Sequence, residues 1–290
     1  MVRIGWLSDS HVDPFSSPDV GRTDLPGAGE CLTEDIVSLF ETYGIEDLFF
    51  NGDAVFQSDA FWDSEYEHSW PAFYDRFWEL VDNSGYGDNV VCTPGNHDVP
   101  LQYFVESDER AHLKYKKEYD DVTVLMVNTA GNGWVSGSPE MGYGWTSGYV
   151  PYKDLQWLDR ELSRAGDNAK IVYFHHHAWF TPGDPNASSE TDSQSASELY
   201  WVCRNHRAIH EILSSYDKVV CPQGHTSQTQ TEGSSNVDGV EYLYKKHYHH
   251  VYDGGVTTYA YLDVDSTGAM VITVDHDTGK ENTILNKTFN

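Results

Sequence analysis

Short apolar runs that each end in a polar cluster are the feature of this 290-residue sequence that most restricts its fold. Runs of this length and composition are typical of strands buried on both faces of a sheet. In five of the six, the polar cluster begins where the strand should end. The six segments are VRIGWLSDSH, DLFFNGD, NVVCTPGNHD, VTVLMVNT, KIVYFHHH and KVVCPQGH.

Helical patterns lie between these runs. Apolar residues recur at helical spacing in LTEDIVSLFETYG, YKDLQWLDRELSRAG and SELYWVCRNHRAIHEILSSY. Alternating strands and helices imply a largely parallel or mixed sheet with helices outside it, and ligands of such sheets collect at the carboxyl ends of the strands. After residue 240 the pattern changes to alternation with turns, which predicts a C-terminal β-meander. We therefore expect a single α/β domain over residues 1–290.

The charge composition excludes several function classes. The chain has 46 acidic and 18 basic residues, a formal net charge of -28. Nonspecific binding to nucleic acid or to an anionic membrane is not expected for such a charge. Nine Trp, nineteen Tyr and twelve Phe supply apolar area for a core, so the chain should fold. We expect a protein suited to high salt, which screens self-repulsion, with an ordinary acidic protein as the alternative.

The N-terminal stretch does not combine a basic start with an apolar run, because a polar motif begins within eight residues. Neither a signal peptide nor a membrane span is therefore expected, and a cytoplasmic location is predicted.

Side chains that bind metals gather at the predicted strand ends. Since these ends meet at one edge of a sheet, the side chains can converge there. Carboxylates, imidazoles and an amide oxygen without thiolates suit divalent metals such as Mn, Fe, Zn or Ni. Asp53 is the central candidate for a carboxylate that bridges two ions. The residues concerned are Asp9, His11, Asp53, Asn96, His97, Asp98, His175, His176, His177 and His225.

The order and spacing of "DSH", "GD", "GNHD", a histidine run and "GH" resemble the calcineurin-like metallophosphoesterases. The resemblance extends from Asp9 to about His225. The segment GYVPYKDLQWLDREL also looks like the part of that family in which a glycine precedes a helix with a Q-x-W-L pattern. The resemblance implies a four-layer α/β/β/α sandwich and hydrolysis of a phosphomonoester or phosphodiester, a small-molecule substrate.

The resemblance further implies a dinuclear centre with two divalent metal ions and a bridging hydroxide. Asp53 would bridge the two ions, and each ion would have ligands of its own. The first ion would be held by Asp9 and His11, and the second by Asn96, His176 and His225. His175 is the rival of His176 as the ligand from the histidine run.

Two further residues would act on the substrate rather than on the metal. His97 would face the leaving group and protonate it, and Asp98 would orient the His97 ring. His206 and His210 lie four residues apart without the acid of an H-E-x-x-H motif, so we expect them on a helix face.

Two positions depart from the related patterns. Phe56 stands where purple acid phosphatases have a tyrosine, so no tyrosinate-iron colour is expected. Ser227 stands where the family usually has the second histidine of Gly-His-x-His. Water or one of His247, His249 and His250 would fill that gap. A weakened first site leaves an alternative function, a binding or structural protein of a larger assembly that keeps the fold.

The loops around the site should select the substrate. We expect them at residues 57–90, 131–148 and 183–197, and the polar stretch 183–197 is a candidate lid.

Overall fold

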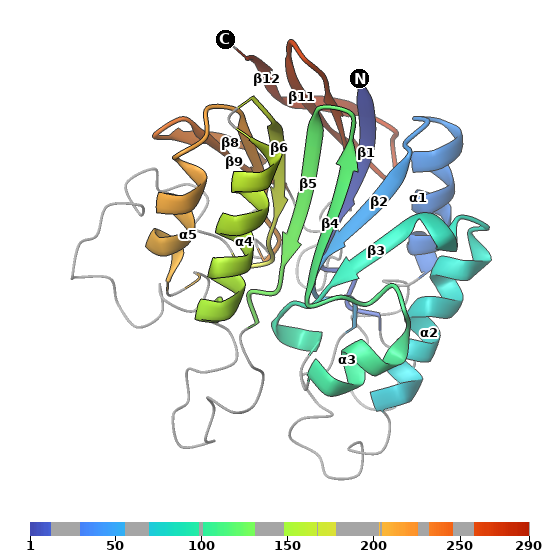
Figure 1. Ribbon diagram of the computed structural model, residues 1–290. Coiled ribbons are helices and arrows are strands. Elements are labelled where there is room, and N and C mark those ends of the chain that lie inside the picture. Colours follow the sequence, from blue (N-terminus) through green and yellow to red (C-terminus); the bar gives the residue numbers. More distant parts are fainter. Residues whose placement is uncertain are drawn as a thin grey trace, which may run out of the picture.

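Two six-stranded sheets lie at the centre of the computed structural model (Figure 1). The structure describes residues 1–12, 30–55, 70–98, 101–130, 148–166, 168–177, 203, 205–225, 232–245 and 258–289. The first sheet has the order β12 (Glu281–Thr288), β11 (Gly268–Asp275), β10 (Thr258–Val264), β1 (Val2–Leu7), β2 (Asp47–Asn51) and β3 (Val90–Thr93). The second has the order β4 (Lys114–Tyr119), β5 (Val122–Val127), β6 (Lys170–Phe174), β7 (Val219–Pro222), β9 (Val240–Tyr244) and β8 (Gly233–Val237).

Each of the six predicted apolar runs forms a strand, and the central strands are buried on both faces. In β2, Phe49 points between the sheets and stacks on Phe174 of β6, with ring centroids 5.3 Å apart. Its neighbours Leu48 and Phe50 point the other way, into the core beneath the helices. This double burial explains why the runs are continuously apolar rather than alternating.

Helices cover the outer face of each sheet, which completes the predicted four layers (Figure 1). Over the first sheet lie α1 (Glu30–Glu41), α2 (Trp70–Asn83) and α3 (Leu101–Ser107). Over the second lie α4 (Tyr152–Ala165) and α5 (His206–Leu213). Three apolar clusters correspond to the three interfaces between the layers.

Three details differ from the sequence prediction. The first strand of the predicted meander, β9, pairs with β7 and β8 in the second sheet, so the antiparallel meander consists of β10, β11 and β12. Part of the predicted loop 57–90 is helix α2, whose apolar side chains pack on the first sheet. The edge strand β4 was not predicted, because its sequence KYKKEY carries three lysines. Charged residues are common on such edges.

Several predicted features lie outside the described residues: Phe56, Ser227, the histidines at 247–250 and the candidate lid at 183–197. Within the part of the chain that the structure describes, no helix combines the length and the apolar character needed to cross a membrane.

Candidate metal centre

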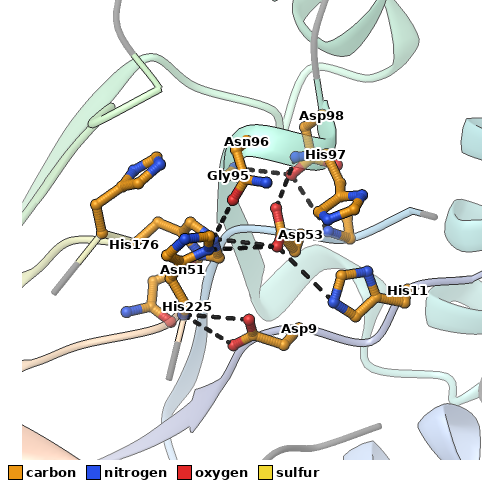
Figure 2. A network of polar contacts seen from close by, with 12 residues as sticks. Asp9, His11, Asn51, Asp53, Gly95, Asn96, His97, Asp98, His176 and His225 are labelled. Carbon is orange, nitrogen blue, oxygen red and sulfur yellow. Dashed lines mark hydrogen bonds and ion pairs between the residues drawn. The ribbon is translucent and has the colours of Figure 1, made fainter. Parts of the chain in front are cut away.

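The carboxyl ends of parallel strands from both sheets meet at one edge of the fold, and the predicted site residues lie there (Figure 2). Asp9 and His11 follow β1, Asp53 follows β2, Asn96, His97 and Asp98 follow β3, His176 follows β6, and His225 follows β7. All of them are buried except His97, which is partly exposed. The strand ends therefore bring these distant segments together, as the sequence pattern predicts.

Asp53 lies at the centre of this group. Its Oδ2 atom is 3.1 Å from Nε2 of His176, 3.8 Å from Nε2 of His11 and 4.0 Å from Nδ1 of His225. Its Oδ1 atom accepts a hydrogen bond of 2.8 Å from the backbone N–H of His97. One oxygen is thus fixed by the backbone, and the other faces three imidazoles.

His176 presents Nε2 to the centre because its other ring nitrogen is engaged. Nδ1 lies 2.9 Å from the backbone carbonyl of Asn51, to which it donates. Its Nε2 atom then lies 3.3 Å from Asn96 Oδ1 and 3.2 Å from His225 Nδ1. A hydrogen bond that fixes the far nitrogen of an imidazole is a regular feature of metal-binding histidines.

The electrostatics of the group favour a cation. Burial alone would raise the pKa of Asp53, but the imidazoles of His176 and His97 hold it well below its usual range. Burial would lower the pKa of His176, but the Asp53 carboxylate raises it to about 9. The pKa of Asp98 rises to about 7 through burial and the charge of Asp53. Several electron-pair donors and a buried carboxylate therefore face one another, so the residues fit a divalent metal ion.

Three glycines let the backbone approach the His176 ring closely. A β-carbon at Gly95 would lie 2.7 Å from His176 Nε2, and one at Gly224 would lie 2.7 Å from Nδ1. A β-carbon at Gly52 would also collide with the ring. These are the glycines of the "GNHD", "GH" and "GD" motifs, so the motifs share a steric reason for glycine. They pack around His176.

Four predicted site residues have a left-handed backbone, which is uncommon for residues other than glycine. Their φ angles are 62° at Asp9, 48° at His11, 54° at Asp53 and 55° at His225. In the described residues, the other non-glycine positions of this kind are Asp120 and Asp238. Backbone strain of this type concentrates at functional sites.

The three consecutive histidines have different surroundings. His175 points toward the helix-covered face, with Nε2 3.6 Å from Cys221 Sγ and its ring 5.1 Å from that of Tyr173. Burial lowers the pKa of His175 to about 3. The Nδ1 atom of His177 lies 2.8 Å from Thr129 Oγ1. The structure thus brings His176 to Asp53 and places its rival His175 elsewhere.

His97 and His11 lie side by side next to Asp53. Their rings meet edge to face with centroids 4.7 Å apart, and together with Asp53 their ligand atoms lie within 4.8 Å of one another. Burial lowers the pKa of His97, opposed by the charge of Asp53. The structure therefore places His97 beside the centre, as its predicted role requires.

Asp98 has contacts that the sequence did not indicate. Its carboxylate accepts backbone hydrogen bonds from Gly95, Ala54 and Val55, at 2.8, 3.2 and 3.3 Å. These bonds join the turn after β3 to the turn after β2. Asp98 thus fixes the loops that carry Asp53 and Asn96, and its predicted action on His97 stays a prediction.

Asn51, at the end of β2, is a supporting residue that the sequence prediction missed. Its side chain accepts from Trp6 Nε1 at 3.2 Å and donates to the backbone carbonyls of His175 and Pro222 at 3.0 and 3.3 Å. It thereby ties the first sheet to the two strand ends that carry His176 and His225. The signal was a polar residue directly before the "GD" motif.

Comparison with solved structures gives the same fold. One structure matches with a TM-score of 0.54 at 10% identity and covers 99% of both chains. A candidate 5′-nucleotidase from Staphylococcus aureus in complex with alpha-ketoglutarate matches with a TM-score of 0.53 at 17% identity. It covers 99% of this chain and 53% of that chain. The NAD nucleotidase of Haemophilus influenzae matches with a TM-score of 0.47 at 12% identity, covering 99% and 49%.

This chain thus spans about half the length of the two nucleotidase structures. A comparison with curated proteins gives no match. The family model for the calcineurin-like phosphoesterases matches residues 2–228, well over half of the sequence, and this stretch contains every residue described at the centre. The chain belongs to the calcineurin-like phosphoesterase family.

Proposed function

We propose that the protein hydrolyses a phosphomonoester or phosphodiester with a divalent metal ion held by Asp53, Asn96, His176 and His225. The observation that carries the proposal is the convergence of the other three ligand atoms, from Asp53, Asn96 and His225, on Nε2 of His176. Carboxylate, amide and imidazole ligands favour Mn, Fe, Zn or Ni over the hard cations Ca and Mg. Family membership supports the choice of a phosphoester as substrate.

A bound divalent ion would polarise the phosphoryl group and acidify an attacking water. The side chains of this protein would supply the rest. The backbone N–H of His97 fixes Asp53, and Asn51 fixes the ring of His176. His97 is the partly exposed member of the group, so its imidazole can reach a substrate. It would donate a proton to the leaving oxygen, a step worth about 10²- to 10⁴-fold in rate.

The adjacent histidines offer a matched test of the metal site. His176→Ala removes a proposed ligand, whereas His175→Ala removes an equally buried imidazole that contacts Cys221. After dialysis against a chelator and addition of Mn²⁺, wild type and His175→Ala should retain metal and hydrolyse bis(p-nitrophenyl) phosphate. His176→Ala should lose at least about 100-fold in metal affinity, since even residues that only support a ligand affect binding 10- to 100-fold. Equal metal binding by both variants would contradict the assignment.

Two esters with different leaving groups test the proposed role of His97 as a proton donor. His97→Ala should slow an ester with a poor alkyl leaving group by about 100-fold or more, and a p-nitrophenyl ester far less, because p-nitrophenolate leaves without a proton. Metal content should not change. His112→Ala is the control, because His112 stacks on Tyr115 and is not part of the centre. An equal loss on both esters, or loss of metal, would refute the role.

The alternative of a binding or structural protein makes the opposite prediction. Such a protein would show no Mn²⁺-stimulated turnover of either ester at low or high salt. That outcome, with an intact fold by circular dichroism, would favour the alternative and end the hydrolytic proposal.

A further inference from the structure

His177, the third histidine of the run, packs against two of the proposed metal ligands. It follows β6 and is as deeply buried as those ligands are. The centroid of its ring lies 4.7 Å from that of His225 and 5.2 Å from that of His176. Among the described residues, His177 belongs to neither group of three metal-binding side chains whose ligand atoms lie within 4.8 Å of one another. It is therefore a neighbour of the centre whose role the metal ligands do not explain.

Two contacts hold one end of the His177 ring. The Oγ1 atom of Thr129, a residue that follows β5, lies 2.8 Å from Nδ1 and accepts the backbone N–H of His177 at 3.0 Å. Gly148 lies against the same end, because a β-carbon there would be 2.5 Å from Cγ and 2.9 Å from Nδ1. The Nε2 atom is at the opposite end of the ring from Cγ. The protein thus fixes the orientation in which Nε2 is presented.

The hydroxyl group of Thr129 determines which ring nitrogen carries a proton. Thr129 is fully buried, and in the residues that the structure describes its Oγ1 atom forms hydrogen bonds with His177 alone. Since Oγ1 accepts the backbone N–H, its own proton needs an acceptor, and Nδ1 is the one within reach. A proton on Nδ1 would leave this buried hydroxyl without an acceptor. The ring proton is therefore on Nε2, as it also would be in a doubly protonated ring.

The Nε2–H group of His177 is a donor without an acceptor. The atom is buried and has no hydrogen-bond partner in the part of the chain that the structure describes. A buried donor that stays unsatisfied costs stability, and in a native protein it indicates a ligand, an ion or a water molecule. An ion is excluded because a protonated nitrogen has no lone pair for a metal. The group therefore calls for a ligand or a water molecule that accepts a hydrogen bond.

The proposed substrate has such acceptors. A phosphoryl group bound at the centre would lie beside the rings of the metal ligands, and the His177 ring packs on two of these rings. We propose that Nε2–H of His177 donates a hydrogen bond to an oxygen of the bound phosphoryl group, so that His177 is a further substrate-binding residue. This inference rests on the proposed function. Because Thr129 and Gly148 hold the ring in place beforehand, the donor is preorganised for a negatively charged oxygen.

Inorganic phosphate tests the inference without turnover. The protein is loaded with Mn²⁺ and desalted, its metal content is measured by elemental analysis, and phosphate is titrated by calorimetry. The amide nitrogen of glutamine takes about the position of Nε2, whereas the shorter asparagine reaches only that of Nδ1. His177→Asn should bind phosphate about 10-fold or more weakly, as expected for a lost hydrogen bond to a charged group. His177→Gln should bind it nearly as tightly as the wild type, and both variants should retain wild-type Mn²⁺.

His175→Asn is the matched control. His175 is an equally buried imidazole of the same run, and its Nδ1 atom also has no partner in the described residues, but the ring faces the helices and contacts Cys221. This variant should keep the wild-type affinity for phosphate. A loss as large as that of His177→Asn would show that any buried imidazole of the run has this effect, and would overturn the inference.

If the variants of His177 do not fold, NMR spectroscopy of the wild type decides. The protein is labelled at the histidine ring nitrogens and loaded with Zn²⁺, which is diamagnetic, and the His177 ring is assigned by its contact with the Thr129 methyl group. The proton should be on Nε2, and its signal should shift when inorganic phosphate is added. A proton on Nδ1 alone, or a signal that phosphate leaves unchanged because a water molecule is the acceptor, would overturn the inference.

The outcomes separate this inference from the proposed function. Wild-type phosphate affinity in His177→Asn, an equal loss in His177→Gln, or a loss of Mn²⁺ from His177→Asn would each overturn the role of His177. With Mn²⁺-dependent phosphate binding and turnover in the wild type, these results would leave the proposed hydrolysis standing. A wild type that retains no Mn²⁺, binds no phosphate and shows no turnover would overturn both proposals.

Discussion

Replacing Asn51 by leucine should weaken both the fold and the metal centre. The Asn51 side chain is fully buried and makes three hydrogen bonds, one to Trp6 within the first sheet and two to carbonyls of the second sheet. Leucine has a similar size but no polar atoms, so the variant Asn51→Leu removes these bonds without opening a large cavity. The backbone carbonyl of residue 51, which accepts from His176, is retained in the variant.

The loss of stability depends on which hydrogen bonds the former partners of Asn51 keep. The carbonyl of His175 still accepts from Gly224 N–H at 3.1 Å, and the carbonyl of Pro222 still accepts from His175 N–H at 3.3 Å. The indole N–H of Trp6 loses its hydrogen bond to Asn51 in a fully buried position. One unsatisfied buried donor and two weakened acceptors together cost about 2–4 kcal/mol. For a chain of this size, we expect the melting temperature to fall by about 4–8 °C.

Urea denaturation of the metal-free protein measures the stability effect, and calorimetric Mn²⁺ titration measures the site. The variant should unfold at lower urea and bind Mn²⁺ at least about 10-fold more weakly, because the two turns tied by Asn51 carry His176 and His225. The control is Asn89→Leu, whose exposed side chain donates to the Glu46 carbonyl and should change stability by less than about 0.5 kcal/mol. Wild-type stability in Asn51→Leu, or lost stability with wild-type Mn²⁺ affinity, would refute the reasoning.

Three further predictions concern a glycine of the metal centre, the pair of His276 and Asp35, and the net charge. Gly95→Ala should lower Mn²⁺ affinity by about 10-fold or more, because its β-carbon would collide with His176. The control Gly44→Ala, whose β-carbon would meet no atom within 4 Å, should keep the wild-type Mn²⁺ affinity. Titration calorimetry measures both affinities. Burial would lower the pKa of His276, but Asp35, 2.7 Å away, raises it. The pair therefore stabilises the fold below about pH 6.5 and loses this effect as the pH rises further, so His276→Ala should lose a few tenths of a kcal/mol at pH 6 and less at pH 9 in urea titrations. Because the net charge is -28, the free energy of unfolding should rise between 0.1 and 1 M KCl as the Debye length shortens from about 10 to about 3 Å, and a fall would contradict this.

The strands were predictable because their apolar runs leave few alternatives, but two elements were not recognised. Helix α2 has buried side chains at Phe73, Tyr74, Phe77, Trp78 and Val81, which is helical spacing. Aromatic residues favour strands as much as helices, so the segment was interpreted as a loop. The assignment of β9 to the second sheet depends on its parallel pairing with β7, and alternation along a strand does not specify its neighbour.

The choice between neighbouring histidines shows where sequence information about the site ends. In β6, Tyr173 faces the helices and Phe174 faces the space between the sheets. His175 points to the helices, as Tyr173 does, and His176 follows the strand and points toward Asp53. Both faces of β6 are apolar, so the sequence does not say whether the odd-numbered or the even-numbered residues after the strand point to the site. The histidine run itself marked the right strand end, because one position of it had to face the other ligands.

The left-handed residues favour a metal-binding role for the centre. A left-handed backbone costs a residue other than glycine about 1–2 kcal/mol, so glycine at Asp9, His11, Asp53 and His225 would relieve strain. The turns are held in place by backbone bonds, from Asp9 N–H to the Gly52 carbonyl at 2.8 Å and from His11 N–H to the Asp53 carbonyl at 3.1 Å. These bonds need no particular side chain. If only the fold mattered, glycine would suit these four strained positions better. The chemistry of the centre therefore explains why metal-binding side chains occupy them.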